Sequence, residues 1–156
     1  MAEEILTAPP WPRSRPGAAG RTVAWLAKVV ERALAEVDLS LPQYRVLGVL
    51  AEGTEVASVL AERLAVRRPS VTAIVDGLVG RGLVGRSAVA GDRRRAALFL
   101  TPRGATLLEQ AHGAVDRRLA GLLDALPEPD AARAAAGLEL WGQALASAHR
   151  GRAALR

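Results

Sequence analysis

Residues 58–84 read SVLAERLAVRRPSVTAIVDGLVGRGLV, which is two helical segments separated by a very short break. We expect a short helix over Val59–Ala65, with Ser58 as its N-cap. A second helix over Arg68–Gly80 has Pro69 in its first turn, where the missing N–H costs nothing. The apolar residues of this second segment recur at i, i+3, i+4 and i+7, the spacing of one buried helix face; they are Val71, Ile74, Val75 and Leu78.

The periodicity changes directly after this stretch. Leu83–Val89 and Arg95–Thr101 have the character of short strands, and residues 90–94 (Ala-Gly-Asp-Arg-Arg) join them. The pattern predicts a β-hairpin with a polar, arginine-rich tip. Two helices joined by a tight break and followed by such a hairpin give the outline of a winged helix-turn-helix in a mainly α protein.

Helices are also expected on both sides of this unit. Ser40 begins a capping box with Gln43, and Thr101 is a good N-cap before Pro102. We expect one domain over residues 21–149, with a winged-helix lobe at about 41–101, a Pro/Gly-rich arm at 1–20 that Trp11 could anchor, and a frayed tail at 150–156. The flanking helices are placed at about 21–37, 102–125 and 131–149, with a break at 127–130.

Composition excludes several classes of function. The 156 residues include no Cys and only two His, so disulfides, thiolate metal sites and thiol redox chemistry are excluded, and neither a metal nor a cofactor is expected. We find no catalytic triad setting, Gly-rich phosphate loop or metal-ligand cluster, so no enzymatic activity is expected. The longest uncharged stretch, residues 140–149, is too short to span a membrane. The start of the chain does not resemble a secretion signal, and we expect a cytoplasmic protein.

Positive charge is concentrated in one segment. Residues 63–103 hold nine Arg against two Asp, a net charge of +7, whereas the rest of the chain carries −2. Such a concentration is typical of a surface that binds a polyanion. The bias towards Arg over Lys also follows from GC-rich codons, whereas the clustering of the charge does not.

The position of this charge predicts contact with double-stranded DNA. Arg67, Arg68, Ser70 and Thr72 occupy the start of the second helix, where the helix dipole also favours an anion. Such a helix start can read base edges in a major groove. At the hairpin tip, Arg93, Arg94 and Arg95 can reach a minor groove, although Arg95 could instead only support the strand. Ser58 is compatible with a simple cap and with a phosphate contact.

These motifs, in this order and spacing, resemble those of the multiple-antibiotic-resistance regulator (MarR) family. The resemblance covers about residues 21–149 and is carried by five motifs: Leu41-Pro42-Gln43-Tyr44-Arg45-Val46-Leu47, Leu60–Val66, Pro69–Thr72 with Val75–Leu78, Gly82-Leu83-Val84, and Asp92-Arg93-Arg94 with Leu100–Gly104. It implies a homodimeric winged-helix transcription factor with six helices that binds a pseudo-palindromic operator. Its first and last helices would form the dimer interface.

The resemblance also implies roles for individual residues. Asp92-Arg93-Arg94 matches the family's wing motif, with Arg94 as the minor-groove residue, and residues 68–73 match the base-reading part of the recognition helix. Two positions depart from the family pattern. Arg67 stands where many members have a Ser or Thr cap, and Ala73 stands where Arg is frequent. These departures bear on which operator sequence is bound. The DNA-contact candidates are therefore Ser58, Arg67, Arg68, Pro69, Ser70, Thr72, Ala73, Asp92, Arg93, Arg94 and Arg95.

The resemblance extends to dimerisation and regulation. A lipophilic or aromatic effector would bind between the dimer helices and the DNA-binding lobe, with Trp25, Tyr44 and Arg45 as candidate contacts; ordinary packing is the alternative for the two aromatic residues. Apolar residues repeat with a 3.5-residue period on the last two helices, which indicates packing along their length, within the chain or between subunits. The candidates for the interface are Leu26, Leu119, Leu122, Leu138, Trp141 and Leu145.

The main interpretation is a ligand-responsive repressor. The alternative is a non-specific architectural or RNA-binding winged-helix protein, which has the same charge pattern but binds all duplexes alike.

Overall fold

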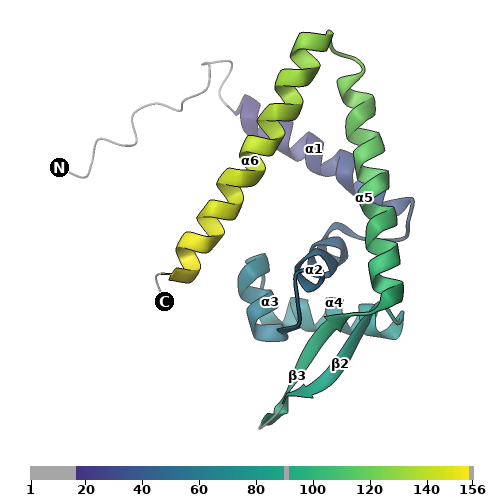
Figure 1. Ribbon diagram of the computed structural model, residues 1–156, viewed down its shortest axis with the longest axis vertical. Helices are drawn as coiled ribbons and strands as arrows, with labels where there is room; N and C mark the ends of the chain where they lie inside the picture. The colour runs from purple at the N-terminus through teal and green to yellow at the C-terminus, as the bar shows by residue number, and fades with distance from the viewer. Residues whose placement is uncertain (1–16, 90–91, 155–156) are drawn as a thin grey trace, which may run out of the picture.

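The computed structural model describes the backbone of residues 17–89 and 92–154 and the side chains of residues 17–88 and 96–148. Trp11 and the first sixteen residues of the expected arm lie outside the described residues. The described chain is mainly helical, with six helices as predicted, and it has three strands (Figure 1). Its elements are α1 (Ala18–Ala35), α2 (Leu41–Ala51), β1 (Glu55–Val56), α3 (Ala57–Leu64), α4 (Arg68–Gly80), β2 (Val84–Val89), β3 (Asp92–Leu100), α5 (Pro102–Leu123) and α6 (Glu128–Ala154).

The starts of α2 and α5 follow the sequence signals. The Ser40 hydroxyl accepts from the Gln43 amide at 3.3 Å, and the Ser40 amide donates to the Gln43 side chain at 2.9 Å, which completes the capping box. The Thr101 hydroxyl accepts from the Gly104 amide at 3.0 Å. It also donates to the Gly82 carbonyl at 2.8 Å, so the cap of α5 is tied to the turn after α4.

Three predicted boundaries are wrong. α3 begins at Ala57 with Val56 in the N-cap position, so Ser58 lies inside the helix and caps nothing. α1 begins at Ala18, inside the stretch expected to be an irregular arm. α6 begins at Glu128, inside the expected break. Pro is tolerated in a first helical turn, and the acidic residues Glu128 and Asp130 favour a helix start, so the Pro-Glu-Pro-Asp stretch starts a helix after Pro127.

The C-terminal segment and the hairpin also differ from the prediction. α6 continues to Ala154, so most of the expected frayed tail is helical. β3 begins at Asp92, so the Asp-Arg-Arg motif belongs to the strand, whereas we expected it in the connecting loop.

The sheet has a third strand that the sequence did not reveal. β1 pairs antiparallel with β3, with Glu55 opposite Leu98 and Val56 opposite Ala97, and gives the strand order β1-β3-β2. A two-residue strand is too short for an alternation pattern, which explains why it was missed. Its effect is to fix the hairpin to the segment between α2 and α3.

The hydrophobic core lies where α2, α3 and α4 meet β3 and the first half of α5. Its fully buried large side chains are Leu34, Leu47, Leu60, Leu78, Leu83, Val46, Val71 and Val75. No buried polar side chain occurs among the described residues. The lobe that holds α4 is therefore stabilised mainly by aliphatic burial.

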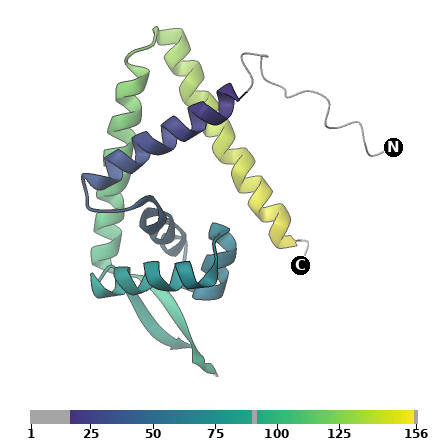
Figure 2. The same cartoon turned by 180° about the vertical axis from the view of Figure 1, so that it is seen from behind.

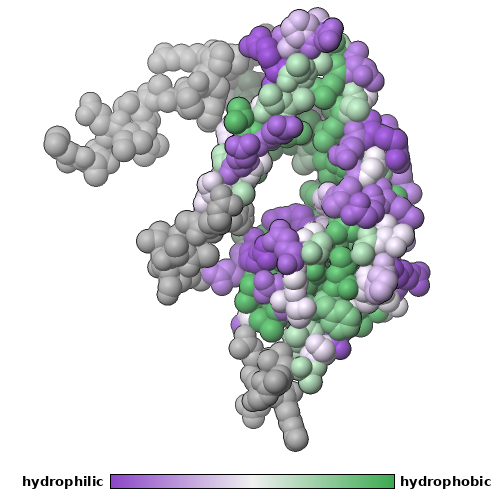
Figure 3. Space-filling model, in the orientation of Figure 1, coloured by the Kyte–Doolittle hydropathy of each residue, from purple (hydrophilic) through white to green (hydrophobic). Residues whose placement is uncertain are grey.

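The helices outside this lobe form an open frame. α5 rises from the lobe, α6 turns back at its top and diverges from it, and α1 crosses both (Figures 1 and 2). The space-filling view shows open space between α6 and the lobe (Figure 3). Because α6 diverges from α5, no other helix of the described residues runs along the apolar repeat of α6 (Figures 1 and 2).

Candidate nucleic-acid interface

The turn between α3 and α4 is built by backbone geometry and by one side chain from α2. Ala65 adopts the left-handed conformation with φ of 54°, and the Val66 amide donates to the Ala61 carbonyl at 3.0 Å, which closes α3. The Arg45 guanidinium donates from Nη2 to the Leu64 carbonyl at 3.0 Å. α2 therefore holds the end of α3 at the point where the chain turns into α4.

α4 has one buried and one exposed face. Val71, Val75 and Leu78 are buried in the core. The predicted contact residues of α4 are all exposed on the other side; they are Arg68, Pro69, Ser70, Thr72 and Ala73. Figure 2 shows α4 along the side of the lobe, above the hairpin. The helix therefore presents its side chains to a partner while its opposite face is fixed.

The N-terminal end of α4 is electropositive. Arg67 is the N-cap residue, no side chain caps this helix, and its first turn has no acidic residue. Arg67 and Arg68 are both exposed. The dipole of α4 and the two guanidinium groups therefore act in the same direction and favour an anion at this helix start.

Six of the nine arginines of the basic segment have described side chains, and these six fall into two groups. Three are held by acidic partners: Arg63 by Glu52 and Glu55, Arg81 by Asp38, and Arg86 by Asp76. The Glu52 carboxylate, hydrogen-bonded to Arg63, raises the pKa of that guanidinium further. Arg67, Arg68 and Arg103 form no ion pair with another residue of the described part. The excess charge at the start of α4 is therefore available to an external anion.

The ion pair between Asp76 and Arg86 joins α4 to β2. Both side chains are partly exposed, and Asp76 lies on the exposed side of α4 together with Thr72 and Ala73. The pair places a guanidinium against the only carboxylate of α4. This partly offsets a negative charge that would otherwise oppose a polyanion at this face.

Two further positions on α4 differ in what they offer a partner. The Thr72 hydroxyl donates to the Arg68 carbonyl at 3.2 Å, so its oxygen remains free only as an acceptor. Ala73 has no polar group. The donors at this face are therefore concentrated in the first turn of α4.

The hairpin of β2 and β3 projects from the lobe below α4 (Figure 1). The backbone of the wing motif, Asp92, Arg93, Arg94 and Arg95, belongs to β3, but these four side chains lie outside the described residues. Their DNA contacts stay predictions.

The three residues predicted to bind an effector differ in their exposure and in their contacts. Trp25 is 69% exposed on α1. Tyr44 is half-buried on α2 and meets His112 of α5 edge to face, with ring centroids 5.6 Å apart. Burial, and secondarily the charge of Asp116, raises the pKa of Tyr44. Arg45 is engaged with the end of α3 as described above, a structural role that the sequence did not indicate. Their contact with an effector stays a prediction.

Most of the predicted dimer-interface residues are exposed in the single chain. Leu26 is half-buried on α1, and Leu119 packs against the core. The other four are between 45% and 60% exposed; they are Leu122, Leu138, Trp141 and Leu145. Leu140, which we did not single out, is 63% exposed on the same helix. Figure 3 shows hydrophobic surface at the end of the molecule formed by α1, α5 and α6.

The described ranges contain neither a cluster of metal-ligating side chains nor a helix suited to cross a membrane. No group of three His, Cys, Asp or Glu side chains there is placed to hold a metal ion. None of the described helices combines the length and the apolar character that crossing a membrane requires.

Part of the chain is similar in sequence to known proteins. Residues 37–95, from the end of α1 to the start of β3, match the model of the MarR family. The HTH-type transcriptional regulator FarR of Neisseria gonorrhoeae is 37% identical over 86 residues. Residues 37–95 therefore form a MarR-family domain. The match with FarR spans 54% of this chain and 59% of FarR. MarR proteins are transcriptional regulators and not enzymes, in agreement with the sequence-based expectation.

Solved structures match over more of the chain. NadR in complex with 4-hydroxyphenylacetate is 27% identical and superposes with a TM-score of 0.65 over 91% of this chain and 98% of NadR. A mutant MarR from E. coli complexed with operator DNA is 24% identical and has a TM-score of 0.61 over 81% of this chain and 97% of that protein. The fold is thus shared with these proteins over most of the length of this chain.

Proposed function

We propose that this chain is a homodimeric transcriptional regulator that binds double-stranded DNA with sequence specificity through α4 and the hairpin. The observation that carries the proposal is the pair of exposed arginines at the start of α4, Arg67 and Arg68, which have no acidic partner among the described residues. The similarity to FarR supports the same function. The same function places the protein with the DNA, in the cytoplasm.

The proposed complex follows from the geometry of the lobe. α4 enters a major groove with its exposed face, and Arg94 at the hairpin reaches the neighbouring minor groove. In a two-fold dimer, the two α4 helices bind half-sites about one helical turn apart, roughly 10 base pairs. α1, α5 and α6 form the dimer interface in this arrangement.

We infer that the protein is a repressor that responds to a ligand. NadR, which has the same fold, is solved with 4-hydroxyphenylacetate bound. An effector between the dimer helices and the lobe changes the separation of the two α4 helices and thereby weakens DNA binding. Titration of 4-hydroxyphenylacetate and related aromatic acids against the protein–DNA complex tests this inference. An operator affinity unchanged at saturating concentrations of each acid contradicts it for this class of effector.

Fluorescence anisotropy tests the DNA-binding function itself. The purified protein is titrated onto the duplex upstream of its own gene and onto a scrambled duplex of equal length, over a salt series. Arg94→Ala is measured in parallel. Tighter binding to the upstream duplex, weakened by Arg94→Ala, is expected. Equal affinity for the two duplexes supports the non-specific alternative, and absence of binding to both at low salt contradicts DNA binding.

A further inference from the structure

Arg63 connects three elements of the DNA-binding lobe through its guanidinium group. It lies in the last turn of α3, and it is ion-paired both with Glu52, which follows α2, and with Glu55 of β1. The distance from Arg63 Nη1 to Glu55 Oε1 is 3.4 Å. In the sequence Arg63 belongs to the basic segment that predicts contact with a polyanion, but in the fold its charge is engaged by two carboxylates of the chain itself.

The ion pair with Glu55 spans the junction between β1 and α3. β1 ends at Val56 and α3 begins at Ala57, so one peptide bond joins the strand to the helix. Val56 occupies the N-cap position, and its apolar side chain gives this helix start no cap. Side chains of a helix point towards its N-terminus, and this direction brings the Arg63 guanidinium back along α3 to Glu55. The pair therefore restrains the angle between β1 and α3.

The two parts of the proposed DNA-binding surface lie on opposite sides of this junction. β1 pairs with β3 through Glu55 and Val56, and β3 belongs to the hairpin that carries Arg94. On the other side, α3 leads through the turn at Ala65 directly into α4. A change in the angle between β1 and α3 therefore moves the hairpin relative to α4 (Figure 1).

The contact between Arg63 and Glu55 is better shielded from water than the other ion pairs of the basic segment. The Arg63 and Glu55 side chains are 35% and 26% exposed, whereas Arg86 and Asp76 are 44% and 56% exposed. In the pair of Arg81 and Asp38, the carboxylate is almost fully exposed. Because water and salt screen a partly buried pair less than an exposed one, this contact is the best suited of the three to hold a fixed geometry.

We propose that Arg63 is a positioning residue for DNA binding, which acts through Glu55 to hold the hairpin at the distance from α4 that lets both reach adjacent grooves of one duplex. This inference rests on the proposed DNA-binding function. Direct contact of Arg63 with a phosphate is the competing role, and the two roles differ in what Glu55 does. If Arg63 contacts phosphate, loss of the Glu55 carboxylate makes the lobe more positive and strengthens DNA binding. If Arg63 positions the hairpin, the same loss weakens it.

Glu55→Leu separates these roles, because Leu cannot accept from Arg63 and is no worse than Glu in a strand. We expect its affinity for the upstream duplex, measured by anisotropy, to fall about fivefold although one negative charge is lost. Arg63→Gln is expected to weaken binding to a similar extent. Glu52→Leu is the matched control, since it removes the same charge from the same guanidinium but leaves the contact between Arg63 and β1 in place. Its affinity is expected to be unchanged or up to about twofold higher.

Double-mutant cycles locate the effect in the hairpin. In an Arg94→Ala background, Glu55→Leu is expected to weaken binding by less than about twofold, because the hairpin contact that it misplaces is already lost. In an Arg68→Gln background it is expected to weaken binding about fivefold, as in the wild type. A general loss of stability would weaken binding equally in both backgrounds. Thermal unfolding of each variant establishes that it is folded.

Three results overturn the proposal. They are unchanged or tighter binding by Glu55→Leu, equal weakening by Glu55→Leu and Glu52→Leu, and equal weakening by Glu55→Leu with and without Arg94. A wild type that prefers the upstream duplex, together with any of these results, contradicts only the role of Arg63. A wild type with no preference for that duplex over the scrambled one contradicts the proposed function and, with it, this inference.

Discussion

The Arg45 guanidinium of α2 donates a 3.0 Å hydrogen bond to the carbonyl of Leu64, the last residue of α3. This carbonyl has no partner further along its own helix, because the chain leaves the helical path at Ala65. The bond therefore satisfies a helix-end acceptor and fixes the start of the turn into α4. The placement of α4 thus depends on a side chain of α2.

Arg45→Met removes this bond while keeping an unbranched side chain. We expect the free energy of unfolding to fall by about 1–2 kcal/mol, because the part-buried Leu64 carbonyl loses its donor. Urea denaturation followed by circular dichroism measures the change. Arg117→Met, an exposed position on α5, serves as the control and is expected to change stability by less than about 0.5 kcal/mol. Equal effects of the two substitutions contradict the role assigned to Arg45.

Gly104 packs against the turn before β2 so closely that no side chain fits. A Cβ atom added at this position would clash with the Leu83 carbonyl oxygen, which is backbone and cannot rotate away. Gly104→Ala is expected to destabilise the protein by about 1–3 kcal/mol. Gly121→Ala on the same helix meets nothing within 4 Å and is expected to leave stability unchanged or raise it by up to about 1 kcal/mol. Thermal or urea unfolding of both variants measures these changes in stability. A Gly104→Ala variant as stable as the wild type contradicts the close packing at Gly104.

The ion pair of Asp76 and Arg86 is expected to matter more for DNA binding than for stability. Because both side chains are exposed, Arg86→Gln is expected to change the free energy of unfolding by less than about 1 kcal/mol. The same variant leaves the Asp76 carboxylate unpaired on the DNA-facing side of α4. We expect DNA affinity to fall about fivefold, and the second change Asp76→Asn to recover most of the loss.

A double-mutant cycle of DNA affinities, measured by anisotropy, checks this coupling. Additive effects of Arg86→Gln and Asp76→Asn contradict it.

The exposed apolar residues of α6 predict association between chains. Trp141 is 60% exposed, and its burial in an interface makes it a strong contributor to dimer affinity. Trp141→Glu is expected to raise the dimer dissociation constant by about 30-fold or more. Gln143→Glu adds the same charge on the other side of α6 and is expected to leave dimerisation intact. Sedimentation equilibrium measures both, and a wild-type chain that is monomeric at high concentration contradicts the proposed interface.

The sequence predicted those parts of the fold that depend on local signals. The capping box at Ser40, the Thr101 cap and the apolar spacing of α4 each depend on neighbouring residues, and each is confirmed. Ser58 shows the limit of such signals. It is a good cap by type, but the pairing of β1 with β3 extends the chain up to Val56, and α3 begins directly after it.

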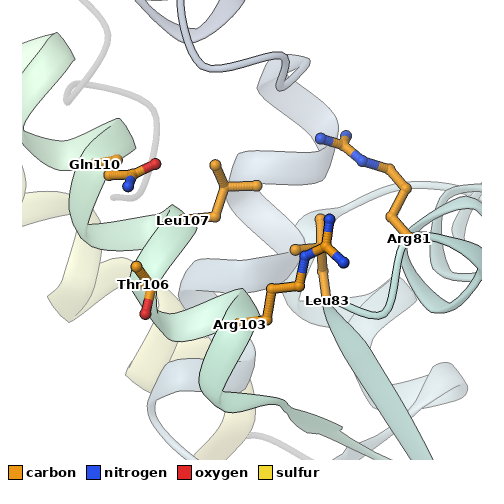
Figure 4. Close-up of a pocket in the computed structure, with 6 residues that line it drawn as sticks. All are labelled: Arg81, Leu83, Arg103, Thr106, Leu107 and Gln110. Atoms are coloured by element: carbon orange, nitrogen blue, oxygen red, sulfur yellow. The ribbon is translucent and has the colours of Figure 1, made fainter.

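The parts that could not be predicted depend on contacts between residues far apart in the chain. Arg45 and Leu64 are 19 residues apart, and nothing at either position indicates the other. A surface hollow joins residues 81–83 to residues 103–110 (Figure 4), and in the sequence its charge was visible only as part of the general excess of arginine. The charge cluster predicted a polyanion surface, but only the structure separates the ion-paired arginines Arg63, Arg81 and Arg86 from the unpaired Arg67, Arg68 and Arg103.

The most direct test of the central claim is the salt dependence of DNA affinity for a variant of α4. In the proposed complex, Arg67 and Arg68 contact phosphates or base edges. The double variant Arg67→Gln, Arg68→Gln is therefore expected to bind the upstream duplex more weakly, with the slope of log affinity against log salt reduced by up to about 2. Arg117→Gln is expected to retain the wild-type affinity and slope. A double variant whose affinity and slope both equal those of the wild type contradicts the claim that the start of α4 binds DNA.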